Sequence, residues 1–163
     1  MKKVLVVMGS DSDLKVMEKC VDRLKSFDIP TEVRICSAHR TPAVAEQLAK
    51  NAAAEGFDVI IAAAGKAAHL GGVLAAYTTL PVIGVPMATS VMGGMDSLLS
   101  IVQMPKGIPV ATVAIDGADN AAILAAQMIA LSDDALAQKL AQFKADMAAE
   151  VTAKDEKVRA QFA

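Results

Sequence analysis

Histidine is scarce in this chain, and one of its 2 histidines has an arginine as its neighbour. The segment reads Ser37-Ala38-His39-Arg40-Thr41-Pro42. An imidazole, with an ordinary pKa of about 6.5, can accept and release a proton near neutral pH. A guanidinium can hold phosphate or carboxylate through two parallel hydrogen bonds. His39 beside Arg40 therefore predicts acid–base chemistry on an anionic substrate, and the alternative is a surface histidine next to a solvated arginine.

Glycine, serine and aspartate fill a second short segment, Gly9-Ser10-Asp11-Ser12-Asp13. Gly9 lets the backbone approach a ligand closely, and Ser10 and Ser12 offer hydroxyl groups. The helix expected to follow presents free N–H groups and a positive dipole end to an anion. Asp13 can accept hydrogen bonds from ribose hydroxyls, as acidic residues do in dinucleotide-binding folds. The same residues are equally typical of an ordinary capped helix start, so the segment alone does not decide between the two.

A third segment holds the other histidine and is rich in small residues. It reads Ala64-Gly65-Lys66-Ala67-Ala68-His69-Leu70-Gly71-Gly72. The small side chains leave room for a flat ring, and Lys66 can meet a phosphate or a carboxylate. The segment is not a Walker phosphate loop, because the earlier glycine and the Ser or Thr after the lysine are absent. His69 is either a site residue or a residue that caps a short helix.

Strand-like and helix-like patterns alternate along the chain and place the three segments at equivalent points. Short apolar runs predict strands at 3–8, 31–36, 58–64, 81–85 and 110–115. Helical spacing predicts helices at 42–56, 69–78, 96–103 and 119–130, and an earlier one whose apolar face is Leu14, Met17, Val21 and Leu24. Thr41 and Pro42 form an N-cap and a first-turn proline. Repeated β–α units predict a mostly parallel sheet, whose ligands bind beyond the carboxyl ends of the strands. The three segments and the loop after Val85 lie there.

The last part of the chain, residues 132–163, has a different character. Ser132 can cap a helix, and Asp133 and Asp134 complement its positive end. One face is apolar and comprises Leu136, Leu140, Phe143, Met147, Val151, Val158 and Phe162. A continuous helix would be roughly 45 Å long at 1.5 Å per residue, whereas a domain of this size has a radius of gyration of about 15 Å. We predict one α/β catalytic domain at 1–131 and a C-terminal helix at 132–163 that packs on a neighbouring subunit. A frayed tail after Glu150 is the alternative.

Composition narrows the classes of function. The formal net charge is -2 and no basic patch stands out, which argues against nucleic acid as a partner. Cys20 and Cys36 lack the spacing of a metal or redox site, so free buried thiols are expected, with a nucleophilic Cys36 as the alternative. Glycine and proline interrupt the uncharged stretch 67–95 too often for a membrane helix. We predict a cytoplasmic protein that needs no metal and binds neither nucleic acid nor membrane.

Four motifs then occur together in one order: Gly9–Asp13, Ser37–Pro42, Ala67–Leu70 and Ser100–Pro105. This combination resembles the carboxyaminoimidazole ribonucleotide mutases of purine biosynthesis, a family also called the catalytic subunit of phosphoribosylaminoimidazole carboxylase. The similarity runs from about Val4 to Ala130. It implies a flavodoxin-like three-layer αβα sandwich with a central parallel sheet, assembled as a homo-octamer. It implies an enzyme, an isomerase, that moves a carboxylate from the exocyclic amine to a ring carbon of an aminoimidazole ribonucleotide, which gives carboxyaminoimidazole ribonucleotide without any cofactor.

The resemblance also implies a role for each matching residue. His39 handles the proton, and the ribose phosphate part is bound by Ser10, Ser12, Asp13, Ser37 and Arg40. The base and carbon dioxide pocket is lined by Gly65, Ala67, Ala68, His69 and Leu70, and the neighbouring Gly9, Ala38 and Lys66 complete the set of substrate contacts. One histidine can protonate the departing nitrogen and then deprotonate the ring carbon, which is worth about 10²–10⁴-fold in rate. Alanine-rich walls suit a small dry pocket that retains carbon dioxide.

Two residues depart from the pattern of these mutases. Lys66 stands where they usually have a second glycine, and Gly71 stands where they usually have proline. A related branch, of the carboxy-lyase type, carboxylates the aminoimidazole directly with carbon dioxide and typically has a basic residue near position 66. That branch typically has lysine after the catalytic histidine and no equivalent of His69, so Arg40 and His69 favour the mutase. Direct carboxylation is the first alternative, and a non-catalytic nucleotide-binding module is the second.

Overall fold

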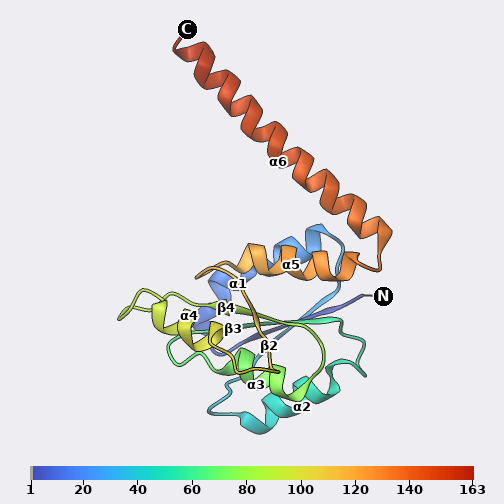
Figure 1. The fold of residues 1–163 in the computed structure, drawn as a ribbon, viewed down its shortest axis with the longest axis vertical. Helices are drawn as coiled ribbons and strands as arrows, with labels where there is room; N and C mark the ends of the chain where they lie inside the picture. The colour runs from blue at the N-terminus through green and yellow to red at the C-terminus, as the bar shows by residue number, and fades with distance from the viewer. Residues whose placement is uncertain (1) are drawn as a thin grey trace.

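Strands and helices alternate from the N-terminus to residue 130 in a computed structural model that describes residues 2–163 (Figure 1). The strands are β1 (Val4–Met8), β2 (Thr31–Ile35), β3 (Val59–Ala64), β4 (Val82–Pro86) and β5 (Ala111–Thr112). The helices are the short 3-10 turn η1 (Asp11–Asp13), α1 (Leu14–Ser26), α2 (Pro42–Ala52), α3 (Leu70–Tyr77), α4 (Met95–Val102), α5 (Ala118–Ala130) and α6 (Asp134–Gln161). The predicted order is confirmed, with two differences in length. The last strand is only a two-residue edge strand paired with β4, and α2 ends four residues before Gly56.

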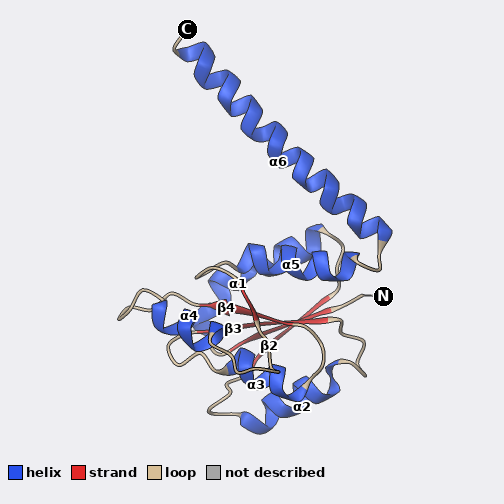
Figure 2. Ribbon diagram, viewed as in Figure 1, coloured by secondary structure: helices blue, strands red, loops and turns tan. Residues whose placement is uncertain are grey.

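The five strands form one parallel sheet in the order β2-β1-β3-β4-β5. This is the flavodoxin-like order, in which strand β2 lies on one side of β1 and the later strands are added on the other, so the strand order reverses between β1 and β3. Helices α1 and α5 cover one face, and α2, α3 and α4 cover the other (Figure 2). The predicted flavodoxin-like three-layer αβα sandwich is therefore confirmed.

The central strands are apolar throughout because helices bury them on both faces. Every residue of β1, β3 and β4 is buried. Gly84 in β4 allows α4 to approach, since an added Cβ there would clash with the Ile101 side chain. On the opposite face α1 buries Met17, Cys20 and Leu24. The expected apolar face of α1 was wrong at its start, because Leu14 is 43% exposed.

Helix α6 leaves the domain soon after it begins (Figure 1). Its N-cap is Asp133, which accepts a 3.0 Å hydrogen bond from the Leu136 N–H, so the expected Ser132 cap was wrong. The Phe143 ring packs edge-on against Phe27 at 5.6 Å, and this first part of the helix holds it to the domain. The helix then continues to Gln161 rather than fraying after Glu150.

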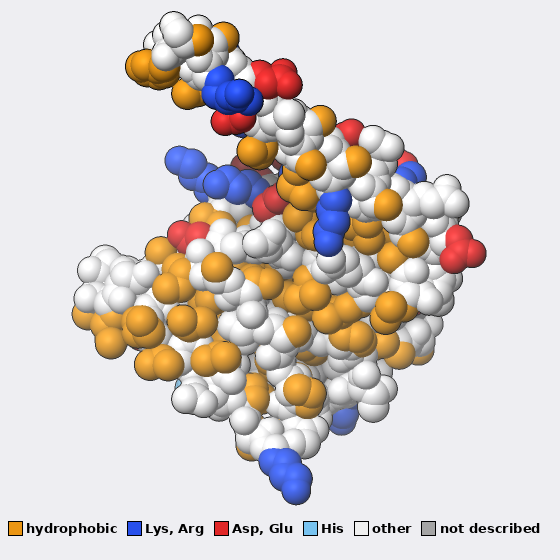
Figure 3. All heavy atoms as spheres, turned by 45° about the horizontal axis from the view of Figure 1, so that its top comes forward, with side chains coloured by type: hydrophobic (Ala, Val, Ile, Leu, Met, Phe, Trp, Pro, Cys, Tyr) orange, Lys and Arg blue, Asp and Glu red, His pale blue; other side chains and the backbone are white. Residues whose placement is uncertain are grey.

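Apolar side chains remain uncovered along the outer part of α6 and just after it, namely Met147, Val151 and Val158 in the helix and Phe162 at its C-cap. Figure 3 shows apolar side chains on this helix and on the surface of the domain. Among residues 2–163, no helix combines the length and the apolar character that crossing a membrane requires.

Candidate active site

The turn after β1 is folded around the hydroxyl of Ser10. Its Oγ accepts hydrogen bonds from the Ser12 N–H at 3.3 Å and from the Ser12 hydroxyl at 3.0 Å. The Gly9 N–H donates to the Ala63 carbonyl at 3.0 Å, which holds the start of the turn against β3. Both serines are thus placed at the carboxyl end of the sheet, in front of α1.

Asp13 ends this turn and is 9% exposed. Burial raises the pKa of its carboxyl group above the ordinary value, and the negative charges of Asp116 and Asp11 raise it further. Hydrogen bonds from Ser10 and Ser12 oppose this rise in pKa only in part. Burial removes most of the water that would otherwise solvate the Asp13 carboxylate. A ligand hydroxyl that donates a hydrogen bond to this carboxylate would therefore restore part of the lost solvation.

The turn after β2 is held by Thr41. Its hydroxyl accepts from the Ser37 N–H and donates to the Ser37 carbonyl, each at 3.0 Å. The Ser37 hydroxyl in turn accepts from the Arg40 N–H at 3.1 Å. Thr41 occupies the N-cap position of α2, as expected, but its side chain makes no cap hydrogen bond. It closes the turn instead, and so presents His39 and Arg40 at an exposed apex.

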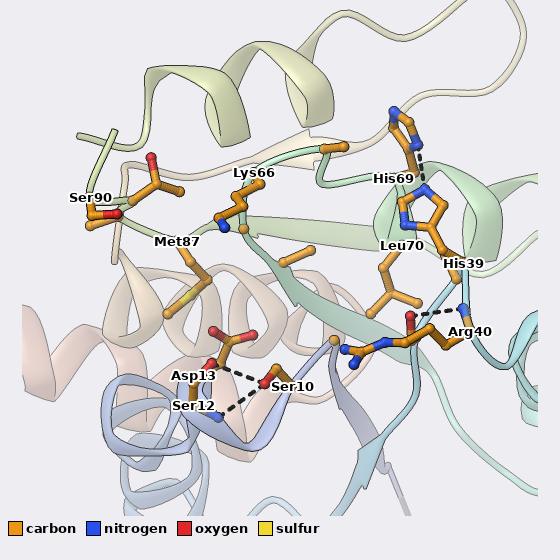
Figure 4. A pocket seen from close by; sticks show the side chains of 18 residues that line it. Ser10, Ser12, Asp13, His39, Arg40, Lys66, His69, Leu70, Met87 and Ser90 are labelled. Carbon is orange, nitrogen blue, oxygen red and sulfur yellow. Dashed lines mark hydrogen bonds between the residues drawn. The ribbon is translucent and has the colours of Figure 1, made fainter. Parts of the chain in front are cut away.

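The two histidines of the chain contact one another across the site. His39 Nε2 lies 2.8 Å from His69 Nδ1, and the rings meet edge to face with their centroids 4.9 Å apart (Figure 4). His69 occupies the N-cap position of α3 but makes no cap hydrogen bond with its side chain. One ring donates and the other accepts, and the tautomer of each imidazole sets the direction of this hydrogen bond.

A single cavity of about 640 Å³ joins the three turns. All the site residues expected from the sequence line it except Ala68, which is fully buried in the core. The expected residues at the cavity are Gly9, Ser10, Ser12, Asp13, Ser37, Ala38, His39, Arg40, Gly65, Lys66, Ala67, His69 and Leu70. Cys36 is buried in the core and does not line the cavity, so free and buried is the correct description of both cysteines.

The loop after β4 supplies a wall that residue types alone did not reveal. Ala64 at the end of β3 and Met87, Ala88, Thr89 and Ser90 line the cavity in addition to the expected residues. The Ala88 N–H donates to Asp116 Oδ1 at 2.9 Å, and the Thr89 hydroxyl donates to Asp96 Oδ1 at 2.8 Å. The position of this loop at a carboxyl strand end was the only signal in the sequence.

The charges of the cavity favour an anionic ligand. Within residues 2–163, neither Arg40 nor Lys66 forms an ion pair with a carboxylate. No three His, Cys, Asp or Glu side chains in that part of the chain are grouped so that they could hold a metal ion. Serine hydroxyls, two cationic side chains, a buried carboxylate and a histidine pair can together bind a phosphorylated sugar and transfer protons.

The sequence profile of the AIR carboxylase family matches residues 3–150. The chain belongs to this family. A relative from Methanocaldococcus jannaschii, named N5-carboxyaminoimidazole ribonucleotide mutase, is 53% identical over 98% of this chain and 99% of its own length. A relative of the same name from Mycobacterium tuberculosis is 53% identical over 94% of this chain and 88% of its own.

Solved structures of the family have the same fold. The crystal structure of Treponema denticola PurE superposes with a TM-score of 0.86 at 30% identity, and the match covers 96% of this chain and 98% of that one. The expected resemblance to the mutases is therefore confirmed, and the matched residues 3–150 continue past the expected limit at Ala130 into α6.

Proposed function

We propose that this chain is a carboxyaminoimidazole ribonucleotide mutase of purine biosynthesis. The family membership and the relatives of that name support the activity. The observation that carries the proposal is the His39–His69 contact of 2.8 Å at a cavity lined by Arg40 and Lys66, which form no ion pair within residues 2–163. A histidine at that place can exchange protons with a ligand whose phosphate is held by the serines and Arg40.

The reaction needs one proton given and one proton taken. A protonated His39 donates to the exocyclic nitrogen as the bond from that nitrogen to the carboxylate breaks, which releases carbon dioxide. The ring carbon then forms a bond to carbon dioxide, and the neutral His39 removes the proton that this carbon carries. The histidine ends in its starting state, so no other acid or base is consumed.

We assign the remaining cavity residues by their chemistry. Ser10, Ser12, Ser37 and Arg40 offer donors to the phosphate, and the buried Asp13 carboxyl suits ribose hydroxyls. Gly65, Ala67, His69 and Leu70 line the cavity and suit the base and the carbon dioxide, and Ala68 is fully buried next to Ala67. Gly9 and Ala38 leave room for the ligand beside the serines and His39.

Turnover measurements test the proposal directly. The carboxyamino substrate is generated in situ from aminoimidazole ribonucleotide, ATP, bicarbonate and the ATP-dependent synthase, and the ring-carboxylated product is followed by ultraviolet absorbance. Turnover of this substrate, lowered about 10²–10⁴-fold in His39→Asn, is the expected result. Ligand binding without any turnover would instead make the chain a non-catalytic nucleotide-binding module.

Direct carboxylation of aminoimidazole ribonucleotide by carbon dioxide is the second candidate, because Lys66 places a cation in the cavity. The same assay with aminoimidazole ribonucleotide and dissolved carbon dioxide alone tests it. Equal or faster turnover by this route would replace the mutase assignment by a carboxylase.

We also propose that the chain is a cytoplasmic homo-oligomer, an octamer by resemblance, in which α6 packs on a neighbouring subunit as a segment distinct from the domain at 1–131. The exposed apolar residues Met147, Val151 and Val158 share one face of α6 and support this packing. Light scattering of the wild type and of Val151→Glu tests it. A smaller assembly in the variant is expected, and a monomeric wild type would contradict the proposal.

A further inference from the structure

The backbone of Lys66 has an unfavourable conformation. Its φ is 55°, in the left-handed region that glycine adopts freely and a long side chain rarely does. The other non-glycine residues with positive φ in the described chain are Asp28 and Asp116, whose short polar side chains tolerate this region. Lys66 has no such side chain, and such a conformation persists only where the surroundings hold it.

Hydrogen bonds at both ends of the residue hold it. The Lys66 N–H donates to Ser97 Oγ at 2.9 Å, and the Lys66 carbonyl accepts from the Ala68 N–H at 2.8 Å. Ser97 comes from α4 and is fully buried. Its hydroxyl donates to the Met87 carbonyl at 2.8 Å, so it links the turn after β3 to the loop after β4. Ser97 thereby joins two walls of the cavity without lining it.

This backbone geometry directs a cation into the cavity. Figure 4 shows the Lys66 side chain extending from its turn into the cavity, with its amino group pointing away from the His39–His69 pair. No carboxylate in residues 2–163 lies within ion-pair distance of it. Arg40 is a second cation on a different turn, and both line the same space. A ribonucleotide that carries a phosphate and a carboxylate has two anionic groups to match two cations.

We infer that Lys66 binds one of these two oxyanions, and that buried Ser97 is the positioning residue that holds the lysine for this purpose. The inference rests on the proposed function only for the identity of the ligand. The shared chemistry is a lysine ammonium with a carboxylate or a phosphate, each of which it meets as a point charge.

Binding measurements with three ligands test the role of Lys66. Dissociation constants are measured by calorimetry for inorganic phosphate, for aminoimidazole ribonucleotide and for its ring-carboxylated derivative. Lys66→Met removes the charge, Lys66→Arg retains it, and Lys106→Met is the matched control, because Lys106 is exposed and lies outside this cavity. We expect Lys66→Met to weaken the affected ligands about tenfold or more, as the loss of a charged hydrogen bond does.

The pattern of losses identifies the oxyanion. If only the carboxylated ligand is weakened, Lys66 binds the carboxylate; if all three are weakened alike, it binds the phosphate. Unchanged affinities for all three in Lys66→Met would overturn the inference. A wild type without turnover would remove the proposed function but leave this comparison intact.

A double-mutant cycle tests Ser97. Ser97→Ala should weaken the same ligand several-fold when Lys66 is present and have no further effect in the Lys66→Met background. Equal effects in both backgrounds would make Ser97 a purely structural residue and refute its positioning role. Because Lys66→Met changes an exposed side chain, the first test stands even if Ser97→Ala does not fold.

Discussion

Replacing His39 by asparagine should separate catalysis from stability. The side chain is exposed, and its hydrogen bond to His69 at 2.8 Å is the only one it makes within residues 2–163. Losing it should change the free energy of unfolding by less than about 1.5 kcal/mol. Loss of the general acid and base should lower kcat about 10²–10⁴-fold. At 1.36 kcal/mol per tenfold, this is about 2.7–5.4 kcal/mol on the barrier.

His69→Asn is the matched control for that loss. It removes one hydrogen bond to the His39 ring, about 0.5–1.5 kcal/mol, and so should lower kcat only about 2- to 13-fold. The assay is steady-state turnover of the carboxyamino substrate for the wild type and both variants, with urea unfolding of each. If His69→Asn lost more activity than His39→Asn, the proton would belong to His69. If His39→Asn kept more than a tenth of wild-type kcat, acid–base catalysis by this pair would be refuted.

Three further substitutions test how the site and the sheet are built. Burial raises the pKa of Asp13 above its ordinary 3.8. Between pH 3.8 and this raised pKa, the folded chain binds more protons than the unfolded chain. The free energy of unfolding therefore falls as the pH rises through that window. Asp13→Asn should therefore raise the free energy of unfolding at pH 7 but not below pH 3.8 in urea titrations, while weakening ribonucleotide binding; equal gains at all pH values would contradict this. Lys66→Gly should raise the free energy of unfolding, measured by thermal unfolding, by up to about 1 kcal/mol. The energy gained by removing a side chain from the left-handed conformation should exceed the cost of the greater entropy that glycine gives the unfolded chain. A lower free energy of unfolding would show that the lysine is not strained. Gly84→Ala should lower stability by about 1–3 kcal/mol in urea titrations, because the new Cβ clashes with Ile101 and lies 3.0 Å from Val110 Cγ1, and an unchanged stability would mean that α4 can move away freely.

The fold was predictable because the strands of a buried parallel sheet have a simple sequence pattern. Strands β1, β3 and β4 are uninterrupted apolar runs, and the helices between them have apolar residues at helical spacing. The topology also locates the site, since turns at carboxyl strand ends meet at one edge of the sheet. Short strand β5 was overestimated, because an apolar run at 110–115 does not reveal where strand pairing ends.

The contacts inside the site could not be read from the sequence. The His39–His69 contact joins residues 30 positions apart, and nothing local distinguishes facing rings from separate ones. Ala68 has the same residue type as its neighbour Ala67, yet only Ala68 is fully buried, because a tight turn decides which side each faces. Ser97 lies in the helix expected at 96–103, and nothing in the sequence marks it, because its role depends on hydrogen bonds to two loops.

The order of synthesis determines when each face of the central sheet can be covered by its helices. One face is closed by α1 and by α5, and α5 contributes a stripe of alanines, Ala118, Ala121, Ala122, Ala125 and Ala126, all fully buried against the strands. Every residue that lines the cavity has been synthesised by position 90, long before α5 is complete at Ala130. While the residues between position 90 and α5 are being synthesised, α1 alone covers this face of β1, β3 and β4. A partly formed domain with exposed apolar surface is prone to aggregate. The nascent chain therefore completes this part of its core only when α5, a late helix of small residues, has been synthesised.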